Sequence, residues 1–211
     1  SNTSSVTNYY REASYGQTWI TGNAYGWFTL AMNSDCSATS QIASLAKQAA
    51  TNAGINLAAY DKYMFIFPNI GCSYTGMGMV GGSDSWINGS LVLRTTAHEL
   101  GHNLGLWHSK AMRCDDVINA NCVTAEYVHT ADMLGTTNIT GHFHPFQKER
   151  LGWINNGASP PVITVESSGT YTISGLAAQD YNPKALKILK STDAYGRKTW
   201  YYVEFRTPSG F

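Results

Sequence analysis

The spacing of apolar positions divides this chain of 211 residues into a mixed first part and a strand-rich second part. Apolar side chains recur at helical spacing in residues 40–53, and the proline-free segment 91–104 also predicts a helix. Continuous apolar runs at residues 25–32 and 63–68 predict strands on either side of the first helix, which is the pattern of a crossover unit. The polar residues 1–15 are expected to form a loop with at most one strand.

A second pattern begins after a linker of Asn, Gly, Ala, Ser and Pro at residues 155–161. A short helix at residues 148–153 closes the part before this linker. Beyond the linker, short apolar runs separated by turn residues predict four strands, at residues 162–165, 171–174, 186–189 and 199–206. We therefore expect an α+β chain with one domain at residues 1–155 and a small β-rich module at residues 156–211, whose parent protein continues beyond Phe211.

The strongest chemical signal lies in the second predicted helix, where His98, Glu99, His102 and the following His108 form the pattern HExxHxxGxxH. Histidines four residues apart lie on one face of a helix, so His98 and His102 can bind one metal ion. Gly105 allows the chain to turn at the helix end and bring His108 to the same ion. Three protein ligands leave a fourth position for water, which is the arrangement of a catalytic zinc site.

Glu99 follows the first ligand and is rotated by about 100° from it around the helix axis. It can therefore contact the zinc-bound water without binding the metal. Two other interpretations of the motif are weaker. A structural zinc site would more often use cysteines or a fourth protein ligand, and Glu126 is not needed as a third ligand while His108 fills that position.

The composition of the chain limits the kinds of partner that it is expected to bind. Charged residues make up only 13% of the sequence and the formal net charge is +0, so nothing indicates binding to nucleic acid or to an anionic membrane. No apolar run approaches the roughly 20 residues of a membrane span. Calcium stays open as a second cofactor, although the scattered acidic residues form no EF-hand loop.

Four cysteines allow three disulfide pairings. We favour Cys36–Cys72 and Cys114–Cys122, because the second pair would close a short loop just after the third histidine and the first would join a helix start to the segment after a buried strand. Since the histidines suffice for the metal, the cysteines have no other evident chemical role. Disulfides in turn predict a secreted, extracellular protein.

The histidine motif resembles that of the metzincin metallopeptidases, and other runs are similar to the gametolysin-like family among them. These are HNLGLWHS at residues 102–109, Tyr127 upstream of the pair Asp132-Met133, and FQKERLGW at residues 146–153. The resemblance implies a metzincin-like catalytic domain, in which a twisted mixed sheet carries an active-site helix.

The resemblance also implies roles for individual residues. It makes His98, His102 and His108 the zinc ligands and Glu99 the general base, and it implies a methionine turn beneath the metal, for which Met133 is the best candidate. The known reaction of such sites is hydrolysis of peptide bonds.

Three further expectations come from the same resemblance. Gly135 stands where some metzincins carry a tyrosine that approaches the zinc, so no tyrosine ligand is expected. The glycine-rich residues 71–89 are expected either to hold an edge strand that aligns substrate or to form a plain loop. A propeptide that keeps the enzyme latent as a zymogen is also implied.

The sequence thus predicts a secreted zinc-dependent endopeptidase that acts on protein or peptide substrates. One alternative is a zinc-bearing but catalytically silent homologue that binds matrix or cell wall, although an altered Glu99 would be expected in such a protein. Another alternative assigns the main task, adhesion to a polymer, to residues 156–211.

Overall fold

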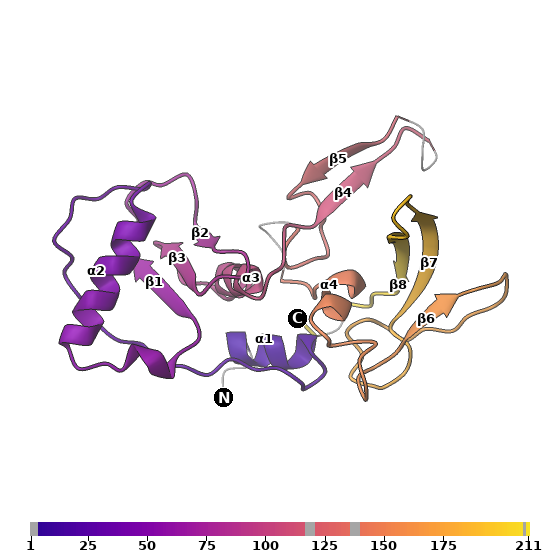
Figure 1. Cartoon of the computed structure of the whole chain (residues 1–211), viewed down its shortest axis with the longest axis horizontal. Helices are drawn as coiled ribbons and strands as arrows, with labels where there is room; N and C mark the ends of the chain where they lie inside the picture. Colours follow the sequence, from indigo (N-terminus) through magenta and orange to yellow (C-terminus); the bar gives the residue numbers. More distant parts are fainter. Residues whose placement is uncertain (1–3, 117–120, 136–139, 209) are drawn as a thin grey trace. The chain divides into compact units, whose positions relative to one another are not determined.

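The computed structural model of the chain describes residues 4–116, 121–135, 140–208 and 210–211 (Figure 1). Its helices are α1 (Val6–Ala13), α2 (Thr39–Asn52), α3 (Leu93–Asn103) and α4 (Pro145–Arg150), with a short 3-10 helix η1 (Leu57–Ala59). Its strands are β1 (Tyr63–Phe67), β2 (Gly76–Gly78), β3 (Asp84–Asn88), β4 (Lys110–Arg113), β5 (Val123–Glu126), β6 (Val162–Val165), β7 (Ala185–Thr192) and β8 (Lys198–Glu204). The expected α+β class is confirmed. No helix in the described ranges is both long enough and apolar enough to cross a membrane.

The chain forms two compact units. The first, called the α3 unit here, comprises residues 20–130 and 134–139 and carries α2, α3 and strands β1 to β5. The second, the α1 unit, comprises residues 1–19, 131–133 and 140–211 and carries α1, α4 and strands β6 to β8. The domain boundary expected in the linker stays a prediction.

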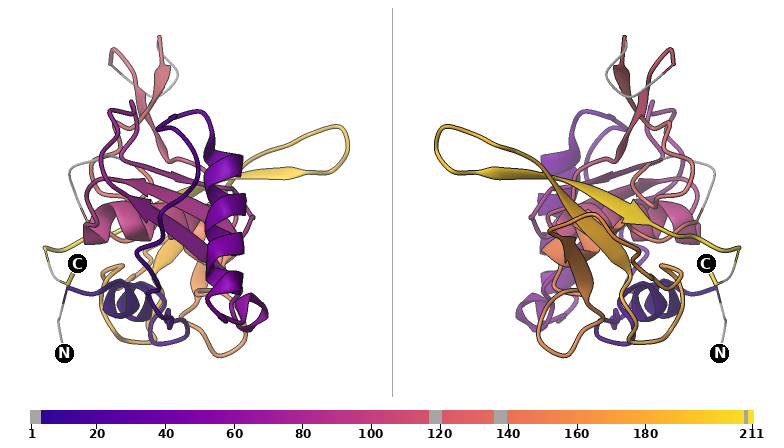
Figure 2. Two further views of the ribbon diagram at one scale, coloured as in Figure 1. Left: turned by 90° about the vertical axis from the view of Figure 1, so that its left-hand side faces the viewer. Right: turned by 90° about the vertical axis from the view of Figure 1, so that its right-hand side faces the viewer.

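The α3 unit is built around a three-stranded sheet in the order β1-β3-β2. Strand β1 runs parallel to β3, whereas β2 runs antiparallel to it, so the sheet is mixed. Helix α2 lies along this sheet (Figure 2), with Ile42 and Ala43 packed against Phe65 of β1 and Trp86 of β3. The helix and the strand predicted at residues 40–53 and 63–68 are therefore confirmed within a residue or two at their ends.

Helix α3 packs against the same sheet through strand β2. Successive strand residues face opposite sides of a sheet, and Met77 joins the core under α2 while Gly76 and Gly78 face α3. A Cβ atom at Gly76 would lie 2.5 Å from Glu99 Oε1, and one at Gly78 would lie 2.5 Å from the Glu99 carbonyl oxygen. The two glycines therefore allow the helix to lie directly on the strand backbone.

Hydrogen bonds fix the C-terminal end of α3 to the same sheet. The side-chain amide of Asn103 donates to the carbonyl oxygens of Met79 at 3.1 Å and Asp84 at 2.9 Å. The backbone amide of Gly81 donates to the carbonyl oxygen of His102 at 2.8 Å. Because Asn103 is itself buried, these bonds satisfy polar groups that have left water and hold the helix end in place.

One strand predicted for the α3 unit is absent. Residues 25–32 form no regular element, and Gly26 has a φ of +113°, which no extended strand adopts. Leu30 and Met32 still pack against the core under α2, whereas Trp27 is 82% exposed. The apolar run therefore reflects the partial burial of its side chains and not the pairing of a strand. The predicted crossover unit, which needed this strand, is wrong.

The α1 unit departs from the prediction at its start. The expected loop at residues 1–15 contains helix α1, which Ser5 caps by accepting a hydrogen bond from the Asn8 amide at 3.1 Å. Tyr9 and Tyr10 are fully buried on this helix. Their burial stabilises a segment whose other residues are mostly polar, which is why the apolar pattern alone does not predict the helix.

The later elements of the α1 unit follow the prediction more closely. Strands β6, β7 and β8 form a sheet in that order, with β6 parallel and β8 antiparallel to β7. Figure 2 shows the β7–β8 hairpin as a long arm. Residues 171–174 form no strand, and α4 begins at Pro145, three residues earlier than expected, because proline is well suited to the first helical position.

A buried polar network lies inside the α1 unit. The imidazole of His142 bridges Glu12 and Lys148, with Nε2 2.9 Å from Glu12 Oε1 and Nδ1 3.1 Å from Lys148 Nζ. Lys148 Nζ also donates to the hydroxyl of Tyr15 at 3.1 Å. Burial lowers the pKa of His142 to about 4 and the pKa of Lys148 well below its usual value. Neutral forms of both side chains are consistent with these contacts.

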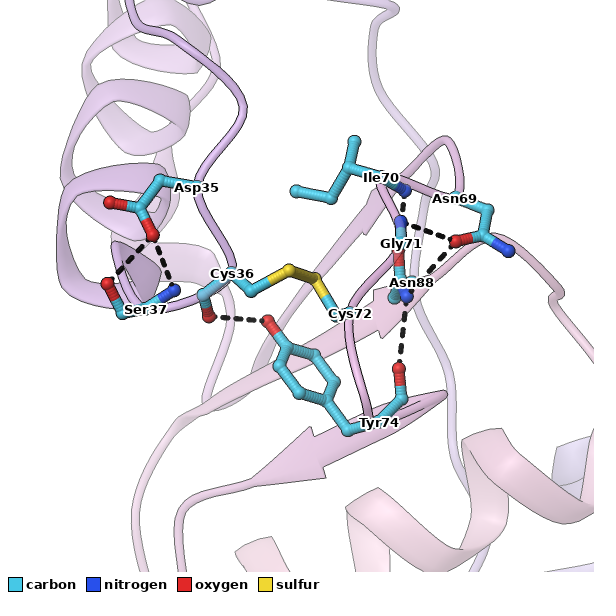
Figure 3. The surroundings of a disulfide bond; sticks show 9 residues. All are labelled: Asp35, Cys36, Ser37, Asn69, Ile70, Gly71, Cys72, Tyr74 and Asn88. Carbon is cyan, nitrogen blue, oxygen red and sulfur yellow. Dashed lines mark hydrogen bonds between the residues drawn. A yellow bond between two sulfur atoms is a disulfide. The ribbon is translucent and has the colours of Figure 1, made fainter.

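Both favoured disulfides, Cys36–Cys72 and Cys114–Cys122, are present. Figure 3 shows the first of them, which ties the segment before α2 to the loop after β1. The hydroxyl of Tyr74 donates to the Cys36 carbonyl oxygen at 3.1 Å beside it. The second closes the β4–β5 hairpin, which directly follows His108.

We expect the two disulfides to stabilise the fold unequally. Replacing both cysteines of the Cys36–Cys72 pair by serine releases a closed loop with a sequence separation of 36, against 8 for Cys114–Cys122. The loop-entropy relation gives losses of about 4 and about 2.5 kcal/mol in the free energy of unfolding. Urea unfolding of the two double variants checks this order. A larger loss for the short loop would contradict the entropic account.

We also expect His142 to make folding sensitive to mild acid. Its folded pKa of about 4 lies below the value of 6.5 for an ordinary histidine, so the unfolded chain takes up the proton first. The contribution of neutral His142 to the free energy of unfolding is complete above pH 6.5. It is lost as the pH falls towards 4, by about 3 kcal/mol in all.

Urea unfolding in the presence of a chelator, between pH 4.5 and 7, measures this effect. The matched variant is His142→Gln, which removes this titrating group. The difference between the two curves isolates the contribution of His142 from those of Glu99, His102 and His108, whose pKa values are also shifted. Equal pH slopes in the two proteins would contradict the prediction.

Candidate metal centre

Three histidines of the α3 unit converge on one point. His98 and His102 stand one turn apart on α3, and their Nε2 atoms are 3.1 Å from each other. The Nε2 atom of His108 lies 3.1 Å from that of His102 and 3.2 Å from that of His98. These three side chains form a cluster able to hold a metal ion, and they are called the histidine triad below.

The turn at the end of α3 brings the third histidine back. Gly105 has a φ of +91°, and its amide donates to the His102 carbonyl oxygen at 2.8 Å. The Leu106 amide donates to the Gly101 carbonyl oxygen at 3.2 Å. These two bonds form a Schellman motif, which ends a helix through a left-handed residue, usually glycine. The predicted turn at Gly105 is present.

The triad fits a zinc ion by its donor chemistry and spacing. Zinc binds imidazole nitrogen at about 2.0–2.1 Å, and two such ligands of one ion lie roughly 3–3.4 Å apart. The three Nε2 separations of 3.1, 3.1 and 3.2 Å meet this requirement. Three unprotonated nitrogens this close also need a shared cation or protons between them, since their lone pairs repel one another.

Contacts on the far side of two imidazoles orient them. His102 Nδ1 lies 2.8 Å from the Leu106 carbonyl oxygen, which can only accept, so Nδ1 carries the proton and Nε2 is free to bind a metal. His108 Nδ1 lies 3.6 Å from Glu126 Oε2. On the third imidazole, that of His98, Arg94 Nη1 lies 3.3 Å from Nδ1.

Burial favours the metal-binding form of two histidines of the triad. It lowers the pKa of His102 and of His108, and for His108 the nearby carboxylate of Glu126 acts in the opposite direction. Unprotonated imidazole is the state that binds metal ions. The packing of α3 against the sheet removes histidine side chains from water and therefore favours metal binding.

Glu99 is buried next to the first histidine. Its side chain is packed against β2 at Gly76, and burial raises the pKa of Glu99 to about 8, with the positive charge of Arg94 acting in the opposite direction. A divalent cation beside this group favours its carboxylate form. Burial and a bound cation therefore act in opposite directions on the proton of this carboxyl group.

The structure shows where two other candidate residues, Glu126 and Met133, lie. Glu126 lies on the Nδ1 side of His108, so it contacts the back of the imidazole while the three Nε2 atoms meet on the other side. Met133 is completely buried and belongs to the α1 unit, so its role beneath the metal stays a prediction.

One residue beside the triad was not expected there. The hydroxyl oxygen of Tyr127 lies 3.0 Å from His108 Nε2, and the two rings are 4.3 Å apart at their centres. A separation of 19 residues carries no periodic signal. Only the β4–β5 hairpin, which starts after His108 and returns at Glu126, brings the tyrosine to the histidine.

Replacing Gly105 by alanine should weaken metal binding. Both Gly105, after α3, and Gly54, after α2, adopt positive φ with open space where a Cβ atom would lie, so either alanine variant should cost about 1 kcal/mol of stability. Only the Gly105 turn positions His108. We expect Gly105→Ala to lower zinc affinity about tenfold or more and Gly54→Ala to leave it unchanged, as measured by competition with a zinc chelator. Equal affinities would mean that this turn does not set the ligand geometry.

Comparison with known proteins identifies the family. Residues 1–168 match the model of the gametolysin peptidase family M11. Searches of curated proteins and of solved structures found no match. The matched region covers most of the chain and includes the histidine triad and Glu99. The chain therefore belongs to the gametolysin family of M11 metallopeptidases.

Proposed function

We propose that the protein is a secreted zinc endopeptidase in which the histidine triad holds the metal and Glu99 is the general base. The observation that carries the proposal is the convergence of three Nε2 atoms within 3.2 Å of one another, beside a buried carboxyl group on the same helix. Three histidines with one open position are typical of catalytic rather than structural zinc.

The chain's own residues account for the proton transfers. Zinc, when bound, supplies a Lewis acid that lowers the pKa of water from 15.7 to about 7 and polarises a carbonyl group. The Glu99 carboxylate accepts the proton of the attacking water and later donates it to the nitrogen of the leaving amine. His102 is kept in the metal-binding tautomer by the Leu106 carbonyl oxygen.

The glycine-rich segment supports the substrate-aligning role expected for it. Strand β2 is at the edge of its sheet, so one side of its backbone is not paired with another described strand. Its Gly76 lies against Glu99. An extended peptide can add to such an edge through main-chain hydrogen bonds, and here it would lie next to the proposed base.

Secretion is supported by the two disulfides, which form and persist in oxidising compartments. The described residues contain no helix able to span a membrane. The zymogen character implied by the resemblance and the methionine turn at Met133 belong to the same proposal.

The alternative of a catalytically silent homologue has less support. A protein that had lost catalysis would not need to keep a buried carboxyl group at Glu99, because desolvating such a group is unfavourable. A polymer-binding role for residues 156–211 would leave the histidine triad unexplained.

Hydrolysis of a labelled protein by the zinc-loaded chain tests the proposal. We expect Glu99→Gln, which keeps the shape of the side chain, to retain one zinc per chain and to lower the rate by about 10²–10⁴-fold. The matched control is Glu126→Gln, which alters a carboxylate behind His108 and should reduce activity far less.

Cleavage by the wild type that persists in Glu99→Gln would disprove the role of Glu99. Full zinc loading without cleavage of any labelled protein would favour the silent homologue. Failure of the wild type to bind zinc would remove the basis of the proposal.

A further inference from the structure

The β4–β5 hairpin returns two consecutive residues to opposite sides of one imidazole. Glu126 Oε2 lies 3.6 Å from His108 Nδ1, whereas the Tyr127 hydroxyl lies 3.0 Å from Nε2. The phenol oxygen therefore lies beside the same nitrogen, Nε2, that approaches the other two histidines.

The hairpin fixes this arrangement from both ends. Lys110, two residues after His108, pairs with Glu126 in the ladder, and Lys110 Nζ is also 3.1 Å from Glu126 Oε1. The Cys114–Cys122 disulfide closes the other end of the two strands. Figure 1 shows the hairpin extending from the end of α3.

The backbone then turns sharply at the tyrosine. Tyr127 has a φ of +59°, a left-handed conformation that is uncommon for a residue other than glycine. This turn directs the ring onto His108, with ring centres 4.3 Å apart. A conformation of this kind costs energy and persists only where the surrounding structure fixes it.

Binding of a metal changes the partner that the hydroxyl can have. Without metal, the Tyr127 hydroxyl can donate to the lone pair of His108 Nε2. Once that lone pair binds the ion, Nε2 cannot accept a hydrogen bond, and the phenol oxygen needs a new partner. The oxygen is 3.0 Å from Nε2, close to the 3.1 and 3.2 Å that separate this nitrogen from its fellow ligands.

We propose that the phenol oxygen of Tyr127 is an additional ligand of the metal held by the histidine triad. A bond from oxygen to the metal forms, the O–H bond breaks, and the proton passes to solvent. This inference rests on the proposed metal site but not on catalysis. It also replaces the expectation, based on Gly135, that no tyrosine approaches the metal.

Copper(II) is a direct probe, because a phenolate bound to it gives a visible charge-transfer band that imidazole ligands do not give. We expect the wild-type chain, loaded with one copper per chain, to show this band and Tyr127→Phe to lose it while keeping the copper. The matched control is Tyr195→Phe, a tyrosine that is 85% exposed in the α1 unit and should leave the band unchanged. Zinc affinity should also fall about tenfold in Tyr127→Phe only.

The outcomes separate this inference from the function on which it rests. Copper bound without the band, or a band that persists in Tyr127→Phe, overturns the tyrosine ligand and leaves the zinc peptidase standing. A wild-type chain that binds neither copper nor zinc overturns both. Because Tyr127 is 47% exposed, its replacement by phenylalanine should not prevent folding, and circular dichroism of the variant verifies this.

Discussion

The close contact between helix α3 and strand β2 is the constraint on which the rest of the α3 unit depends. Glycines at positions 76 and 78 let the helix backbone lie against the strand, and Asn103 then ties the helix end to the sheet. A helix held this closely buries His98, Glu99 and His102 together. Burial removes these groups from water and shifts the pKa values of Glu99 and His102, so the chemistry of the site follows from a packing contact.

The position of the third histidine, His108, depends on a different feature, the turn at the end of α3. The Schellman turn at Gly105 satisfies the last carbonyl groups of α3 and reverses the chain within a few residues. The carbonyl oxygen of Leu106, in the same turn, fixes the tautomer of His102. One short turn therefore both delivers a ligand and orients another, which explains why the spacing of the motif leaves so little freedom.

Beyond the turn, the β4–β5 hairpin adds two further polar groups to the surroundings of the three histidines. It places a carboxylate behind His108 and a phenol in front of it, and a disulfide holds the two strands together. The two disulfides therefore have different roles in the α3 unit. Cys36–Cys72 restrains the segments that enter α2 and leave β1, whereas Cys114–Cys122 restrains the surroundings of the metal site.

The sequence by itself determined the helix α3, the triad spacing, the turn at Gly105 and the strands β1 and β6, because each is encoded by residues close together or by a strong local pattern. Both disulfide pairs were also predicted, although Cys36 and Cys72 are 36 residues apart, because four cysteines allow only three pairings. Prediction from the sequence failed where burial came from distant partners, as for helix α1, whose tyrosines are buried although most of its residues are polar, and for residues 25–32, whose apolar side chains pack without strand pairing. Only the tertiary structure decided that Gly76 lies against Glu99 and that Tyr127 meets His108. Both contacts join residues about 20 apart in sequence, and such contacts are set by strand pairing and helix packing rather than by any periodicity of the chain.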